Sequence, residues 1–132
     1  MGNIKYIKPS DMPNTLGPYQ YGASTEGWLF IAGQIPVNPD NPDAALPATI
    51  EEQTEIVFKN IWRILKAAGY GPQHVLNVRV FLKDLLRDIN GYNTVYVKQF
   101  EAGKYPSRTT VGVTALAKDA LIEIDLVAYK EP

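Results

Sequence analysis

The sequence contains no cysteine and a single histidine, and these absences remove several kinds of chemistry. Without cysteine the chain has no disulfide, no thiolate nucleophile and no thiolate zinc site. The lone His74 has no second histidine to share a metal ion, and no aspartate-rich loop has the spacing that calcium binding requires. We therefore expect no metal site, and a protein that works in a reducing compartment.

Long apolar runs and basic clusters are also missing. No stretch of about 18 apolar residues occurs, and residues 1–6 lack the apolar core of a signal peptide. The chain of 132 residues carries 13 basic and 14 acidic side chains, scattered along its length, for a net charge of −1. The sequence predicts one soluble cytoplasmic domain over residues 1–132, with neither a membrane nor a nucleic acid as its partner.

Hydrophobic periodicity predicts an α+β chain of two helices and about six strands. The clearest helix begins with a capping box, from Thr49 and Glu52, and ends at Gly69. Strands are indicated where apolar and polar residues alternate between turn residues. The expected strands are Ile4–Ile7, Gln20–Ala23, Trp28–Ala32, Val75–Leu82, Thr109–Thr114 and Leu121–Tyr129, and the expected helices are Thr49–Ala68 and Asp88–Phe100.

Two helices can cover only one face of such a sheet. The other face stays partly apolar, because Trp28, Phe30 and Phe81, or their alternates, lie on it. A mixed face of this kind suits a subunit interface, so we predict self-association through it. In the last strand we expect Ile122, Ile124, Leu126 and Ala128 on one face, and Leu121, Glu123, Asp125 and Val127 on the other.

Arg108 and Glu123 are the strongest candidates for a binding site. Arg108 follows a proline turn at a strand entrance, and a guanidinium can hold a carboxylate through two hydrogen bonds. Glu123 lies in an otherwise apolar strand, where a charge is costly to bury without partners. Plainer interpretations stay open: Arg108 could pair with any surface carboxylate, and Glu123 could pair with Arg79 or Lys118. These residues indicate an anion site but no reaction.

Several motifs resemble the RidA/YjgF/YER057c/UK114 family, in the same order and spacing, from about residue 15 to residue 129. The last two motifs are the most specific. The matching motifs are Gly17-Pro18-Tyr19, Ala32-Gly33-Gln34-Ile35-Pro36, Glu51-Glu52-Gln53-Thr54, Ala67-Ala68-Gly69, Val80-Phe81-Leu82-Lys83-Asp84, Asn93-x-x-Tyr96, Tyr105-Pro106-Ser107-Arg108-Thr109 and Ile122-Glu123-Ile124.

This resemblance implies a chorismate-mutase-like α+β fold and a homotrimer, in which three sheets form a central barrel with the helices outside. Ligands of the family bind in clefts between subunits. Its archetypal reaction is the hydrolysis of reactive 2-imino or enamino acids to 2-oxo acids and ammonia, without a cofactor. The implied small-molecule partner is a carboxylated imine or enamine, or a 2-oxo acid.

The resemblance also implies a role for single residues. Arg108 matches the arginine that grips the substrate carboxylate, and Glu123 matches the acid that orients or activates the attacking water. Tyr19 matches a tyrosine that shapes the cleft, and Gly33 a glycine whose backbone lines it. Asn93, from a further matching motif, is expected to contact the substrate.

Three positions depart from the family pattern. Ala32 stands where the imine deaminases often carry serine, and Thr110 where cysteine is common; both are expected to line the substrate-binding site. Gln20-Tyr21 replaces a small or apolar residue followed by glutamine. These changes leave the carboxylate anchor intact and widen the range of possible substrates, so a larger aminomuconate-type substrate is an alternative.

Two other functions stay open from the sequence. The first is a non-catalytic binding protein that uses Arg108 to sense a metabolite carboxylate. The second is a ribonuclease or translation inhibitor, an activity attributed to some members of the family. We rank it last, because the isoelectric point is near 5.8 and no basic stripe is present.

Overall fold

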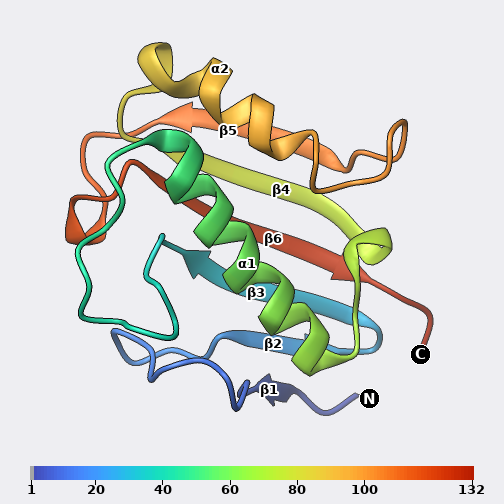
Figure 1. Ribbon diagram of the computed structural model, residues 1–132. Coiled ribbons are helices and arrows are strands. Elements are labelled where there is room, and N and C mark those ends of the chain that lie inside the picture. Colours follow the sequence, from blue (N-terminus) through green and yellow to red (C-terminus); the bar gives the residue numbers. More distant parts are fainter. Residues whose placement is uncertain (1) are drawn as a thin grey trace.

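Two helices lie on one face of a six-stranded mixed sheet, and the opposite face carries no helix (Figure 1). This computed structural model describes residues 2–132. It confirms the predicted α+β class, with six strands and two helices. The strands are β1 (Lys5–Ile7), β2 (Gly22–Thr25), β3 (Trp28–Gln34), β4 (Val75–Leu82), β5 (Ser107–Gly112) and β6 (Ile122–Tyr129); the helices are α1 (Ile50–Ala68) and α2 (Leu85–Tyr96), with short 3-10 turns at Pro72–His74 and Ala117–Asp119.

The strand order is β1-β2-β3-β6-β4-β5. Strand β6 therefore lies inside the sheet, antiparallel to both β3 and β4, although it is the last strand of the chain. Only β5 runs parallel to its neighbour, β4. A parallel pair needs a crossover connection, and α2 supplies it, lying over the β4–β5 edge (Figure 1).

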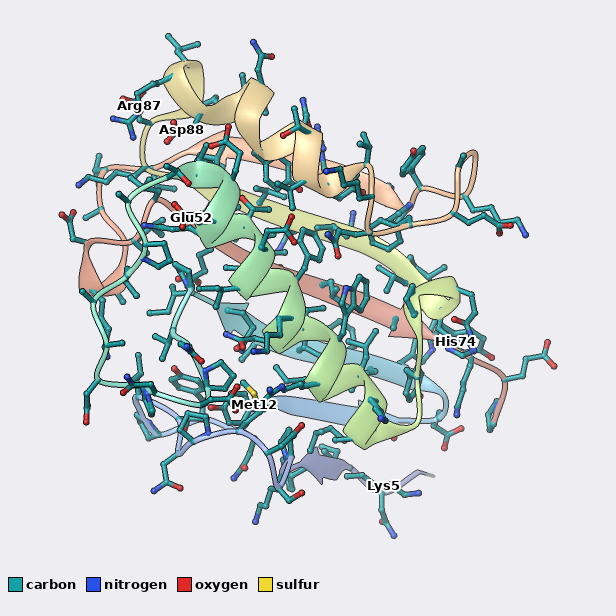
Figure 2. All side chains as sticks on the ribbon, viewed as in Figure 1. Lys5, Met12, Glu52, His74, Arg87 and Asp88 are labelled. Atoms are coloured by element: carbon teal, nitrogen blue, oxygen red, sulfur yellow. The ribbon has the colours of Figure 1, made fainter. Side chains whose placement is uncertain are left out.

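The start of α2 differs from the prediction. Helix α2 begins at Leu85, and its cap is Asp84, whose side chain accepts a hydrogen bond from the Arg87 N–H at 3.3 Å. Asp88, with which the predicted helix began, is instead buried in the first turn and receives two hydrogen bonds from the Arg87 guanidinium, each 2.9 Å long (Figure 2). Both aspartates precede an apolar stretch, and only tertiary contacts select between them.

The end of α2 and the position of β2 also differ. Helix α2 ends at Tyr96 rather than Phe100. Phe100 is nevertheless buried, because the chain after the helix turns back and packs its ring edge-on against Phe58 and Trp62 of α1. Strand β2 starts at Gly22, two residues later than expected, where pairing with β3 begins.

Helix α1 agrees with the prediction at both ends. The Thr49 hydroxyl accepts a hydrogen bond from the Glu52 N–H at 3.1 Å and donates one to the Glu52 carboxylate at 2.9 Å. Gly69 closes the helix in the left-handed conformation, with φ of +83°, which side chains disfavour. This helix is the longest in the described residues, and none of the helices there is long and apolar enough to cross a membrane.

The hydrophobic core lies between the helices and the sheet. The alternation predicted for β6 is confirmed, since every second side chain of that strand is buried beneath α1. The apolar side of α1 meets it, as its periodicity predicts. Fully buried core residues include Val57, Ile61, Ile64 and Leu65 of α1, and Ile122, Ile124, Leu126 and Ala128 of β6.

The helix-free face exposes large aromatic side chains. Tyr6, Trp28 and Phe30 keep 58%, 43% and 56% of their surface in solvent. Beside them Arg79 and Asp125 form an ion pair, with 2.6 Å between Nη2 and Oδ2. Within the chain Arg79 therefore pairs with Asp125 and not with Glu123, because the register places Asp125 directly opposite Arg79. An apolar face with paired charges is the surface we expected at a subunit interface.

Removing the cap of α1 should weaken the fold measurably. In Thr49→Ala the Glu52 N–H loses its acceptor, and the free energy of unfolding should fall by about 1 kcal/mol. Urea titration of wild type and variant at one protein concentration measures this. Thr114→Ala, an exposed threonine outside both helices, is the control. Equal losses in the two variants would contradict the role of Thr49 as a cap.

Candidate functional site

The seven predicted site residues form two groups in the single chain. One group lies where β5 meets α2, and the other surrounds the end of β3. Each group is compact, but the chain does not bring the two together. The first group is Arg108, Thr110 and Asn93, and the second is Tyr19, Ala32, Gly33 and Glu123.

The two groups lie on opposite faces of the sheet. Residues paired directly across neighbouring strands point to the same face. Arg108 pairs with Val78, and Val78 pairs with Leu126; both partners are buried beneath the helices. Glu123 pairs with Phe81 and alternates with the buried residues of β6, so its side chain points to the helix-free face. Arg108 and Glu123 of one chain therefore cannot contact the same small molecule.

The Arg108 guanidinium lies over the rings of Tyr92 and Tyr96, which together form an aromatic floor. Its central carbon lies 4.6 Å from the ring centroid of Tyr96 and 5.2 Å from that of Tyr92. Its Nη1 donates a hydrogen bond of 2.8 Å to Oδ1 of Asn93. Tyr105 stacks on the far part of this floor, with 6.2 Å between its ring centroid and that of Tyr96. The exposed guanidinium is thus held in place while part of its fork of donors faces solvent.

Arg108 differs from the other three arginines in its partner. Arg63, Arg79 and Arg87 each form an ion pair with aspartate. Among residues 2–132, no carboxylate lies within ion-pairing distance of Arg108, whose hydrogen-bond acceptor is a neutral amide. The interpretation of Arg108 as a surface arginine paired with a nearby carboxylate is therefore wrong. Within the described residues no carboxylate offsets its positive charge.

The floor beneath Arg108 stays neutral. Burial raises the pKa of the Tyr92 hydroxyl strongly, against the opposing effect of the Arg108 charge, so the ring remains protonated. Burial raises the pKa of Tyr96 as well. The Thr110 hydroxyl is buried in the same layer. Tyr92 and Tyr96 are buried in the core, and their second role under Arg108 was not predicted from the sequence; their i, i+4 spacing beside Asn93 was the available signal.

The Glu123 carboxylate lies in a pocket at the end of β3. The β3–β6 register shifts between Ile31 and Gln34, so β3 bulges at Ala32 and Gly33. A Cβ atom on Gly33 would lie only 2.2 Å from Oε2 of Glu123, so a side chain at this position would displace the Glu123 carboxyl from its place in the pocket. A glycine inside a strand is the signal that could have predicted the bulge. The pocket, of about 280 Å³, is lined by Leu16, Tyr19, Ala32, Gly33, Ile35, Ala117 and Glu123; Leu16, Ile35 and Ala117 were not predicted.

The environment of Glu123 favours its protonated form. Partial burial and, secondarily, the negative charge of Asp125 raise the pKa of the Glu123 carboxyl above its ordinary value. A carboxylate with a raised pKa accepts a proton more readily near neutral pH, which is the property required of a general base. Lys118, the other suggested partner, lines a neighbouring pocket rather than pairing with Glu123.

His74 takes no part in either group. Its Nδ1 accepts a hydrogen bond of 2.9 Å from the Gly71 N–H, so it closes the 3-10 turn that precedes β4 (Figure 2). His74 therefore has a structural role at this turn. Among residues 2–132, no three acidic or histidine side chains are grouped closely enough to hold a metal ion.

A match to the family described as endoribonuclease L-PSP covers residues 9–130. The chain belongs to this family. A RutC family protein of Pyrococcus horikoshii is 44% identical over 125 residues, which is 95% of this chain and 97% of the relative. The match confirms the resemblance to the RidA/YjgF family, since solved Rid structures have the same fold.

Two solved structures illustrate this likeness within the L-PSP family. YyfA of Yersinia pestis, described as a Rid-family protein of unknown function, has a TM-score of 0.90 and 34% identity, and the match covers 97% of this chain and 100% of YyfA. Escherichia coli TdcF, solved with bound serine, has a TM-score of 0.89 and 32% identity, with 96% and 99% covered. The topology of the sheet and its two helices is thus that of the Rid fold.

The raised pKa of Glu123 predicts how stability depends on pH. The folded-state pKa of Glu123 lies above the unfolded-state value, so the protonated carboxyl stabilises the folded chain. This stabilising contribution is lost as the pH rises through the folded-state pKa and Glu123 ionises. Relative to wild type, Glu123→Gln should therefore gain more stability as the pH rises above about 4, the ordinary pKa of a glutamate side chain. Urea titrations across this range test it, with Glu131→Gln as control; a gain that shrinks with rising pH would contradict the shift.

Proposed function

We propose that this protein hydrolyses reactive 2-imino or enamino acids to 2-oxo acids and ammonia, as a member of the L-PSP/Rid family. The observation that carries the proposal is Arg108, the arginine held by a neutral amide and an aromatic floor rather than by an aspartate. A second group, with Glu123 at its centre, offers a proton acceptor in a pocket of small-molecule size. Carboxylate anchor and base are the two groups that this reaction needs.

The reaction follows from these two groups. Arg108 binds the substrate carboxylate through two parallel hydrogen bonds and so fixes the imine carbon. Glu123 accepts a proton from a water molecule as the water oxygen bonds to that carbon and the C=N electron pair moves to nitrogen. Glu123 then gives this proton to the nitrogen. Glu123 then accepts the proton of the new hydroxyl group and passes it to the same nitrogen as the C–N bond breaks. The nitrogen, which already carries the imine hydrogen and the first proton, leaves as ammonia, the hydroxyl oxygen becomes the carbonyl of the 2-oxo acid, and Glu123 is ionised again.

We infer that Arg108 and Glu123 of one site come from neighbouring subunits. The two residues of a single chain point to opposite faces of the sheet, so one molecule can meet both only across an interface. The exposed aromatic side chains of the helix-free face provide a surface for association. A homotrimer, which the family resemblance implies, has the cyclic symmetry that would repeat the site at each interface.

The bound serine of TdcF supports a carboxylated ligand, since an amino acid occupies a protein of the same fold. A non-catalytic binding protein is the second candidate, because Ala32 lacks a hydroxyl that could orient water. An aminomuconate-type substrate would use the same anchor and base. The family description also names ribonuclease activity, but the net charge of −1 gives no electrostatic basis for RNA binding.

Shortening Arg108 should remove most of the activity. Arg108→Lys keeps the charge but loses the planar fork, so kcat/KM for an imine generated in situ should fall about tenfold; Arg108→Ala should fall about a hundredfold or more. Ammonia release measures the rate. Lys98→Ala, an exposed lysine just after α2 and outside both groups, is the control. Equal rates for wild type and Arg108→Ala would overturn the anchor, and binding of 2-oxo acids without turnover would favour the binding protein.

Mixing two inactive variants tests the site between subunits. Arg108→Ala and Glu123→Gln are each expected to be inactive alone, but a mixed oligomer would contain sites with both native residues. Random mixing in a cyclic oligomer should restore roughly a quarter of the sites. The two proteins are unfolded together, refolded and assayed for ammonia release, with light scattering to give the oligomeric state. Complete absence of restored activity in a confirmed mixed oligomer would place both residues within one chain.

A further inference from the structure

A second pocket adjoins the Glu123 pocket. It has a volume of about 150 Å³ and lies beneath two connecting segments, 12–16 and 37–43. Met12 belongs to the first segment, where the N-terminal loop passes beside α1 (Figure 2). Most of the wall is apolar, from Met12, Pro13, Leu16, Ile35, Val37 and Pro42.

One arginine of α1 holds both segments in place. The Arg63 guanidinium binds both oxygens of Asp40, at 3.2 Å each, and so fastens the second segment. The same group donates a hydrogen bond of 2.8 Å to the carbonyl of Asp11, at the start of the first segment. Lys59, one turn earlier on α1, adds a second contact to Asp40 at 3.3 Å.

Inner hydrogen bonds hold the same two segments from beneath. The Tyr21 hydroxyl donates a hydrogen bond of 2.7 Å to the carbonyl of Pro13. The buried amide of Asn60, on α1, donates one of 2.9 Å to the carbonyl of Val37. Both walls are therefore fixed to the sheet and to α1, so the pocket is preformed rather than a gap between mobile loops.

The two pockets share a wall. Leu16, Tyr19, Gly33 and Ile35 line both of them. The short turn at Ala117–Asp119 also connects them, because Ala117 lines the Glu123 pocket and Lys118 lines the second. A molecule whose reacting carbon lies beside Glu123 can therefore extend a substituent past Tyr19 into the second pocket.

Size and charge limit what this substituent can be. A cavity of about 150 Å³ with apolar walls accommodates a group the size of benzene. Asp43 and Lys118 bring one charge of each sign to its lining, so the pocket favours neither an anion nor a cation. A neutral apolar group of roughly four to six carbon atoms fits it.

We propose that this second pocket binds the apolar side chain of the substrate and makes the protein selective for imino acids with medium-sized aliphatic side chains. This inference rests on the proposed function for the reacting centre, and it adds the residues that choose the substrate. Val37 and Met12, one from each of the two segments, are specificity-determining residues. Arg63 is a positioning residue that acts through the two segments.

Imines generated in situ by an L-amino-acid oxidase from alanine and leucine test the selectivity. The wild type should hydrolyse the leucine-derived imine with a kcat/KM at least about tenfold above that of the alanine-derived imine, because the larger side chain buries more apolar surface. Calorimetry supplies a second measurement that needs no turnover. The 2-oxo acid made from leucine should bind at least about tenfold more tightly than pyruvate.

Filling the pocket should remove this preference alone. Val37→Phe, or Met12→Phe in the other segment, should lower kcat/KM for the leucine-derived imine about tenfold and change that of the alanine-derived imine less than about twofold. Leu86→Phe, at an exposed leucine of α2 that is 90% in solvent, adds the same ring elsewhere and should change neither value. Circular dichroism identifies any variant that fails to fold.

The outcomes separate this inference from the proposed function. Equal affinity of the wild type for the two 2-oxo acids, or equal losses for both ligands in the filled variants, would overturn the pocket assignment while leaving imine hydrolysis intact. Preference for the larger 2-oxo acid, lost in the filled variants, would support the pocket even if no imine is turned over. In that case the proposed hydrolysis alone would fail.

Discussion

The alternation of side chains between the two faces of the sheet decides which residues of one chain can meet. Because neighbouring side chains along a strand alternate between faces, the side chain of Arg108 points to the helix-covered face and that of Glu123 to the helix-free face. A one-residue shift in the register of either strand would turn its side chains to the other face and expose core residues to solvent. Burial of the core therefore keeps the two groups on opposite faces. The chain thus carries both halves of the proposed site in places where it cannot join them by itself.

The helix-free face combines an apolar surface suited to association with two acidic residues on one strand. An association surface should be apolar, but it must also hold Glu123 and Asp125 close together on one strand. Arg79 offsets the charge of Asp125 through a direct ion pair, which leaves Glu123 without a compensating cation among residues 2–132. The missing side chain of Gly33 gives the carboxyl room at the bulge. The raised pKa of Glu123 follows from this arrangement, because the carboxyl is partly buried at the bulge and lies near the charge of Asp125.

Local sequence signals predict the bounds of a helix where only one residue can cap each end. They fail where two residues could cap the same end. Helix α1 has one threonine cap and one terminal glycine, and its bounds agree with the prediction. Helix α2 has two aspartates that could cap it, and the choice depends on Arg87 and on burial, which no local pattern contains. Arg108 and Glu123 could be singled out by residue type. Their separation could not, because it depends on the parallel pairing of β5 with β4.

Three contact points orient a small molecule completely, and the proposed complex supplies three. In this proposal Arg108 would hold the carboxylate, the reacting carbon would lie beside Glu123, and the side chain would enter the pocket lined by residues 12–16. Tyr19 lines both pockets, so it stands where the substituent leaves the reacting carbon. A substrate that fills all three points presents one face of its planar imine to the water near Glu123, and a substrate without a side chain loses one of the three constraints. Selectivity and rate would then depend on the same wall.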